Sequence, residues 1–234
     1  MKPNSRTIIH LGINLVITPF PVINQITSLA FQNAIIAHGL EYQNAINEQN
    51  KLILIRGKPY PLEITVGALN LPNTGQLIIV APLPNRPVDV FIQEAEAVAE
   101  AFLSTWNYQF LIIGSDTAIR ELHETSEEHA FQEIWEKRLK QPGDALSAFE
   151  RPIRAGGLRF ILDPKVGDPN PIRIEVKIES FIDNTKKIFI ETLFFYFQPP
   201  QGSEFNITQR IKETDQYVTN QVYNFFKERT NDNG

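Results

Sequence analysis

One segment of the chain, residues 188–197, restricts the possible folds more than any other. Its sequence, IFIETLFFYF, is almost entirely apolar and predicts one long β-strand. Successive side chains of a strand point to opposite faces, so this strand is apolar on both faces, whereas most half-buried strands are apolar on one. The two sets are Ile188, Ile190, Phe194 and Tyr196 on one face and Phe189, Leu193, Phe195 and Phe197 on the other. Both faces therefore need a cover that excludes water.

A second two-faced strand is predicted at residues 76–83, where Leu77 and Ile79 alternate with Ile78 and Val80. By contrast, residues 172–179 alternate as IRIEVKIE, which leaves one charged face in water. We expect the other half of the chain or a sister subunit to cover the second apolar face, with a groove for a ligand or partner as the alternative. The candidate interface residues are Phe189, Leu193, Phe195, Phe197, Ile78 and Val80.

The pattern of apolar residues predicts the same order of elements twice, namely strand, helix, three strands and helix. We therefore predict an α+β fold of two pseudo-repeated β-α-β-β-β-α units, residues 1–106 and 107–234, packed as one globular body. Their mainly antiparallel sheets would be covered on one face by helices. The predicted strands are residues 11–18, 51–56, 62–69, 76–83, 108–113 resuming at 118–123, 158–162, 172–181 and 188–197, and the predicted helices are 21–38, 87–106, 126–140 and 206–229.

Apolar residues at helical spacing predict which side of each helix is buried. Thr125 followed by Glu128 resembles a capping box at the start of the third helix. The inward residues are predicted to be Ile23, Ile26, Ala30, Ala34 and Ala37 in the first helix, Phe91, Ala95, Val98 and Phe102 in the second, Phe131, Ile134, Trp135 and Leu139 in the third, and Ile207, Ile211, Val218, Val222 and Phe225 in the last.

The charge balance argues against nucleic-acid binding. The chain has 22 Lys and Arg against 27 Asp and Glu, a net charge of −5, so its surface repels phosphate backbones. It contains no cysteine, which excludes disulfides and thiolate chemistry and agrees with a reducing cytosol. No apolar run approaches the roughly 18–20 residues of a transmembrane helix, so we expect a cytoplasmic protein without a membrane partner.

No catalytic constellation, metal site or cofactor motif is recognisable. His123 and His129 are six residues apart, which does not suit a helical metal pair, and we interpret them as surface histidines. Asp116, Glu121 and Glu124 form a carboxylate cluster without a second ligand group. One local basic patch could bind an anion through guanidinium groups and glycine amides, although a hinge into a strand is the simpler interpretation. Its residues are Arg151, Arg154, Gly156, Gly157 and Arg159.

Two short features carry a resemblance to an uncharacterised, sporadically distributed bacterial family of two-repeat α+β proteins. They are the run Ile119-Arg120-Glu121-Leu122-His123 and a long last helix with a late Phe, residues 218–226. That family has a His-Glu pair where this chain has Thr214-Asp215-Gln216. The tandem order is also similar to the TATA-binding-protein-like fold, but there four strands follow the first helix, and the acidic charge here argues against a DNA saddle.

These observations favour a non-enzymatic protein-interaction or scaffold protein that associates with itself, as a homodimer, or with a protein partner through its apolar sheet surface. The alternative is a binding protein or enzyme for a small apolar or anionic ligand, held between sheet and helices near the loop of residues 154–159. Neither hypothesis involves a cofactor.

Overall fold

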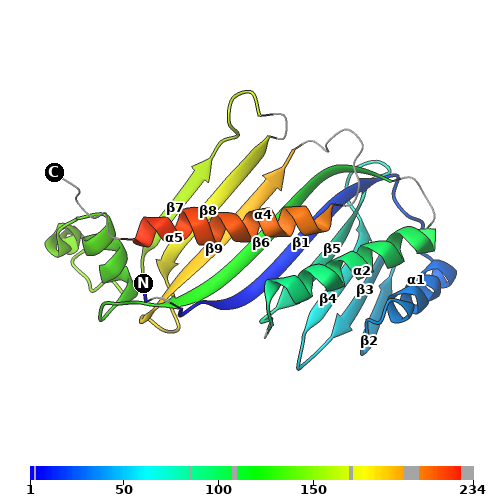
Figure 1. Ribbon diagram of the computed structural model, residues 1–234, viewed down its shortest axis with the longest axis horizontal. Coiled ribbons are helices and arrows are strands. Elements are labelled where there is room, and N and C mark those ends of the chain that lie inside the picture. The colour runs from blue at the N-terminus through cyan, green and yellow to red at the C-terminus, as the bar shows by residue number, and fades with distance from the viewer. Residues whose placement is uncertain (3, 85, 107–109, 169–170, 198–205, 228–234) are drawn as a thin grey trace.

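The computed structural model describes residues 1–2, 4–84, 86–106, 110–168, 171–197 and 206–227. Nine strands form one antiparallel sheet in the order β2-β3-β4-β5-β1-β6-β9-β8-β7 (Figure 1). The predicted α+β class is confirmed, with a single large sheet. The strands are β1 (Thr7–Thr18), β2 (Asn44–Glu48), β3 (Lys51–Arg56), β4 (Leu62–Ala68), β5 (Gly75–Pro82), β6 (Leu111–Glu124), β7 (Gly157–Leu162), β8 (Ile172–Ser180) and β9 (Lys187–Tyr196).

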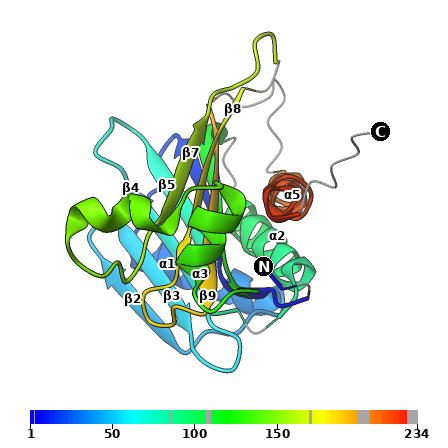
Figure 2. The same ribbon diagram turned by 90° about the vertical axis from the view of Figure 1, so that its left-hand side faces the viewer.

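Three long helical elements pack on one face of this sheet (Figures 1 and 2). Phe31, Phe91 and Ile211 from these elements share one core with Leu11 and Leu77 of the sheet. The helices are α1 (Gln25–Ala37), α2 (Val88–Trp106), α3 (Ala130–Gln132), α4 (Ile207–Tyr217) and α5 (Tyr223–Phe226), with the π-helical segments η1 (Glu133–Arg138) and η3 (Val218–Val222) and the 3₁₀ segment η2 (Gly143–Phe149).

The two halves of the chain meet edge to edge. Strand β1 pairs with β6 along most of its length, for example Ile13 with Thr117, and this pairing continues the first half's strands into the second half's. The expectation that one half covers the second apolar face of the other is therefore wrong, because both halves lie in the same sheet. We call the face opposite α2 and α4 the open face; its apolar residues include Val16, Ile78, Val80, Ala118, Phe189, Leu193, Phe195 and Phe197.

The sheet is strongly curled. Figure 2 shows that β2–β4 at one end and the segment with α3 at the other both project to the side opposite α2 and α5. The twist that all strands share accounts for this curl, since it accumulates from strand to strand. The open face is thus flanked at both ends of the molecule.

The first helix is shorter than predicted and buries a different side. Asn24 caps it by accepting a hydrogen bond from the Thr27 amide, and the Thr27 hydroxyl accepts one from the Asn24 amide, so the helix begins at Gln25. Ser28, Phe31 and Ile35 are buried. Ile26 of the predicted stripe is 79% exposed, because the aromatic contacts of Phe31 with Phe102 and Trp106 set the helix's rotation.

Most strands were predicted within one or two residues, with three exceptions in the sheet. Strand β1 begins at Thr7, four residues before the predicted Leu11. Strand β2 was missed; it is exposed along its length and pairs only with β3 among the described residues, so it has no apolar pattern. With β2, four strands follow α1. Strand β6 runs without the predicted break, since Gly114, Ser115 and Asp116 pair with β1. The predicted beginning of that strand, at Tyr108, lies outside the described residues.

The predicted helix at residues 126–140 is replaced by the short α3 and the π-helical η1. The predicted capping box is absent: the Thr125 hydroxyl donates to Glu133 Oε2 at 2.6 Å, and His129 Nδ1 caps α3 by accepting the Phe131 amide. Of the four predicted inward residues, Ile134 is fully buried.

The last helix contains a π turn that changes which phenylalanine is buried. In an α-helix, side chains spaced four residues apart do not point in the same direction. Each lies roughly 40° further around the axis than the one before, because four residues exceed one 3.6-residue turn. The π segment η3 takes up this drift between Val218 and Val222. Phe226 is consequently buried in place of the predicted Phe225.

Two alanine substitutions on α1 test its corrected orientation. Phe31→Ala should lower the free energy of unfolding by about 3–5 kcal/mol, because a fully buried ring is lost and leaves a cavity. Ile26→Ala, on the exposed side of the same helix, should change it by less than about 0.5 kcal/mol. Urea unfolding followed by circular dichroism measures both, and equal losses would contradict the observed orientation.

Candidate functional site

The six candidate interface residues come together on the open face. In the ladder, Ile78 lies beside Asn14, Asn14 beside Asp116, and Asp116 beside Phe195. Val80 and Leu193 belong to the next row, while Phe189 and Phe197 extend the same face of β9 in both directions. Phe197 is 49% exposed, and the other five are partly exposed. Residues far apart in the sequence therefore form one mixed surface across β5, β1, β6 and β9.

A polar pair occupies the middle of this surface. Asn14 Nδ2 donates to Asp116 Oδ1 at 3.0 Å, across the junction of the two halves. Burial raises the pKa of Asp116, and the hydrogen bond from Asn14 only partly offsets this effect. The pair therefore places one half-buried carboxyl group among the apolar side chains of the open face.

The charged residues of the open face are paired with one another. Glu191 accepts from Arg120 at 2.5 Å and from Lys177 at 3.0 Å, and these contacts hold its pKa below the ordinary value although burial alone would raise it. Towards the β7 edge, Arg159 pairs with Glu175 at 2.6 Å. The Arg173 guanidinium lies over the Phe195 ring, 4.6 Å from its centre. The surface thus has ionic groups of both signs, and both of these glutamates are paired with basic side chains.

His10 lies at the rim of the open face on β1. Burial and the nearby charge of Arg120 lower its pKa from 6.5 to about 4, while Glu191 acts in the opposite direction. The imidazole is therefore neutral at physiological pH.

His10 should make folding sensitive to mild acid. The pKa of His10 is about 4 in the folded state and 6.5 in the unfolded state. Its contribution to the free energy of unfolding is therefore complete above pH 6.5 and is lost as the pH falls through about 4. With a discount for partial exposure, about 1–2 kcal/mol of unfolding free energy should disappear across this window. In His10→Gln the slope of stability against pH between 6.5 and 4 should be shallower; an unchanged slope in urea titrations would contradict the assignment.

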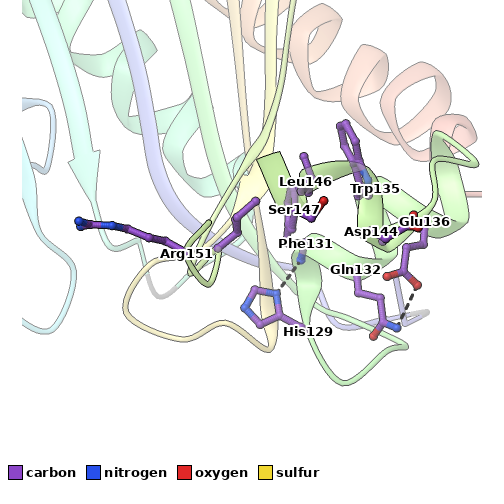
Figure 3. Close-up of a pocket in the computed structure, with 11 residues that line it drawn as sticks. His129, Phe131, Gln132, Trp135, Glu136, Asp144, Leu146, Ser147 and Arg151 are labelled. Carbon is purple, nitrogen blue, oxygen red and sulfur yellow. Dashed lines mark hydrogen bonds between the residues drawn. The ribbon is translucent and has the colours of Figure 1, made fainter. Parts of the chain in front are cut away.

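The candidate anion patch is not assembled. Arg159 pairs with Glu175 on the open face, and Arg154 donates to the Ile182 carbonyl at 3.4 Å. Arg151 lies in a hollow of about 360 Å³ beside α3. Figure 3 shows its guanidinium pointing away from the other residues that line this hollow.

The hollow in Figure 3 is built within one local segment of the chain. Phe131 and Trp135 stack at 5.9 Å and form its aromatic wall. The Trp135 indole donates to the Pro142 carbonyl at 3.1 Å, and Gln132 donates to Glu136 at 3.1 Å. His129 also accepts a hydrogen bond from the Phe131 amide within the same wall, so several polar groups of the hollow are engaged locally.

Close packing explains the two glycines. A Cβ on Gly156 would lie 2.5 Å from the Phe131 ring, and one on Gly157 would lie 2.3 Å from the Ile178 carbonyl oxygen. The Gly156 amide already donates to Ser180 Oγ at 3.0 Å. The glycines let the chain approach α3 and β8, and this amide is not available to an anion.

Two strand glycines give a matched test. Gly157→Ala should lower the free energy of unfolding by about 1–3 kcal/mol, because backbone atoms of β8 must move. Gly67→Ala, where the nearest atom is the flexible Lys51 Cγ at 3.4 Å, should leave it unchanged or slightly higher. Thermal unfolding measures both, and equal stabilities would show that close approach does not explain Gly157.

A buried ionic network, not anticipated from the sequence, ties β6 to the last helix. Arg6 Nε donates to Glu121 at 2.7 Å and its second nitrogen to Asp215 at 2.6 Å, while His123 Nε2 lies 2.8 Å from Glu121. Burial alone would raise the pKa of Glu121, but His123 and Arg6 hold it below 4.5. His123 is therefore a buried residue, not a surface histidine as predicted.

This network is structural. The Glu121 carboxylate and the His123 imidazole are inaccessible to solvent. The carboxylates of the sequence cluster separate, since Asp116 faces the open side and Glu121 the helices. Among the described residues, no group of three or more acidic or histidine side chains could hold a metal ion. Nor is any helix in the described part of the chain long and apolar enough to cross a membrane.

Comparisons with known proteins add little. No protein-family profile matches the chain, and no curated protein matches it. Among solved structures, it is similar to DynU16, a protein in the dynemicin biosynthetic locus, with 10% identity over 92% of this chain and 94% of that chain. The TM-score is 0.24, so this similarity carries no argument about fold or function.

Proposed function

We propose that this chain is a non-enzymatic interaction protein that forms a homodimer through the open face of its sheet. The observation that carries the proposal is the convergence of Ile78, Val80, Leu193 and Phe195 on a face opposite the helices, where they stay partly exposed. Contiguous apolar surface of this kind marks interaction sites in proteins.

The charges of the open face favour a second copy as the occupant. Two copies of a surface with an excess of one charge would repel each other, whereas Glu191 and Glu175 are already paired with basic neighbours. A twisted sheet also packs well on another sheet of the same twist, about 10 Å away. The same pairing disfavours a nucleic acid, which needs unpaired cations.

A proposed twofold relation between the halves of the chain fits the same geometry. We propose that residues 1–106 and 107–234 are two related β-α-β-β-β-α units, with the first unit carrying the additional strand β2. From the centre of the sheet outward, the strand order is β1-β5-β4-β3 on one side and β6-β9-β8-β7 on the other. We further propose a cytoplasmic location, in keeping with the absence of cysteine.

A charged substitution should break the dimer without unfolding the chain. Phe195→Asp places a carboxylate in the middle of the open face and should weaken self-association at least 100-fold, a loss typical of a central aromatic residue. Size-exclusion chromatography with light scattering, run over a range of concentrations, measures the mass.

The matched control is Ile26→Asp, a charge placed at an exposed apolar residue of α1. It should remain dimeric, and circular dichroism should show both variants folded. A wild-type chain that is monomeric at every concentration, or equal dissociation of the two variants, would refute the proposal.

A further inference from the structure

A cavity beside the last helix results from unequal helical cover in the two halves. In the first half, α1 and α2 pack against each other over the sheet. In the second half α3 has three residues and lies at the ends of β8 and β9, while α4 lies against β6 and β9. Beside the last helix, over β7 and β8, there is a cavity of about 630 Å³.

The end of this cavity at the β7–β8 connection is acidic. Glu213 reaches it from α4, and Asp163 and Asp168 reach it from the β7–β8 connection, with Lys165 as the one basic residue in its lining. Glu213 accepts a hydrogen bond from the Tyr196 hydroxyl at 3.2 Å, and among the described residues no cation lies within ion-pair distance of it. Burial and the charge of Asp168 raise the pKa of Glu213, and the hydrogen bond from Tyr196 and the charge of Arg210 offset this effect only in part.

The opposite end, towards α5, is apolar and aromatic. A smaller cavity of about 130 Å³ shares Leu162, Tyr217 and Gln221 with the larger one and extends it along the sheet. Phe160 and Leu162 of β7 form its wall and are each 38% exposed. Phe160 touches the Phe225 ring, with 6.1 Å between the ring centres. An elongated space thus has carboxylates at one end and apolar walls at the other.

We propose that this space binds an amphiphilic organic cation. Its ammonium head lies among Glu213, Asp163 and Asp168, next to the Phe194 and Tyr217 rings, and its aliphatic tail lies along Phe160 and Leu162. Carboxylates and aromatic faces are the groups that recognise ammonium ions in proteins. The volume suits a small molecule with a chain of this type. The site is on the helical side of the sheet, so it does not depend on the open face.

Calorimetric titration with decyltrimethylammonium, below its micelle concentration, tests the proposal. Saturable binding at one site is expected, with affinity at least tenfold above that of decyl sulfate, which has the same chain and the opposite charge. Glu213→Gln should weaken binding of the cation about tenfold, because one ionic attraction to the ammonium head is lost, while the amide oxygen still accepts from Tyr196. Phe160→Ala should weaken binding of both probes to this site, because the wall for the tail is removed.

The control for net charge is Glu48→Gln in the exposed strand β2, which should bind like the wild type. Equal affinity for the two probes, equal effects of Glu213→Gln and Glu48→Gln, or the absence of a saturable site would overturn the proposal. Thermal unfolding of each variant confirms that it is folded, so a loss of binding is not a loss of structure.

Discussion

The ladder between β1 and β6 is the interaction on which the rest of the structure depends. These are the two longest strands, and their pairing joins the halves through backbone hydrogen bonds in the middle of the sheet. Once the halves are joined edge to edge, their helices lie on the same face and the opposite face of both is left without helical cover. The open face is therefore a consequence of how the halves meet.

Much of the fold was predictable where local pattern and tertiary environment agree. Strands β3, β4, β5, β8 and β9 have apolar alternation, and α2 has an apolar stripe that its Phe91 and Phe102 bury as expected. The prediction failed where pairing with a strand distant in the sequence determines the local conformation. Gly114 to Asp116 have the composition of a turn, yet β1 holds them extended, and β2 is polar because its only described neighbour is β3.

The candidate sites also divide into those that a local pattern reveals and those that depend on tertiary contacts. The alternation of β5 and β9 was enough to select Ile78 and Phe195 for the open face, because side-chain direction in a strand is a local property. The arginine patch relied on closeness in the sequence alone, and the chain turns its three guanidinium groups to different surroundings. The network of Arg6, Glu121 and Asp215 joins three distant segments, so no local signal could have revealed it.

The π turn of the last helix separates two α-helical parts whose buried sides point in different directions around the helix axis. Ile207 and Ile211 of its first part belong to the core shared with the first half, whereas Val222 and Phe226 belong to the separate core of the second half. A uniform α-helix of this length could not keep its apolar side on both cores, since its stripe would wind away from the second. The extra residue in the π turn rotates the apolar side of the helix between the two hydrophobic cores, so that one continuous helix packs on both.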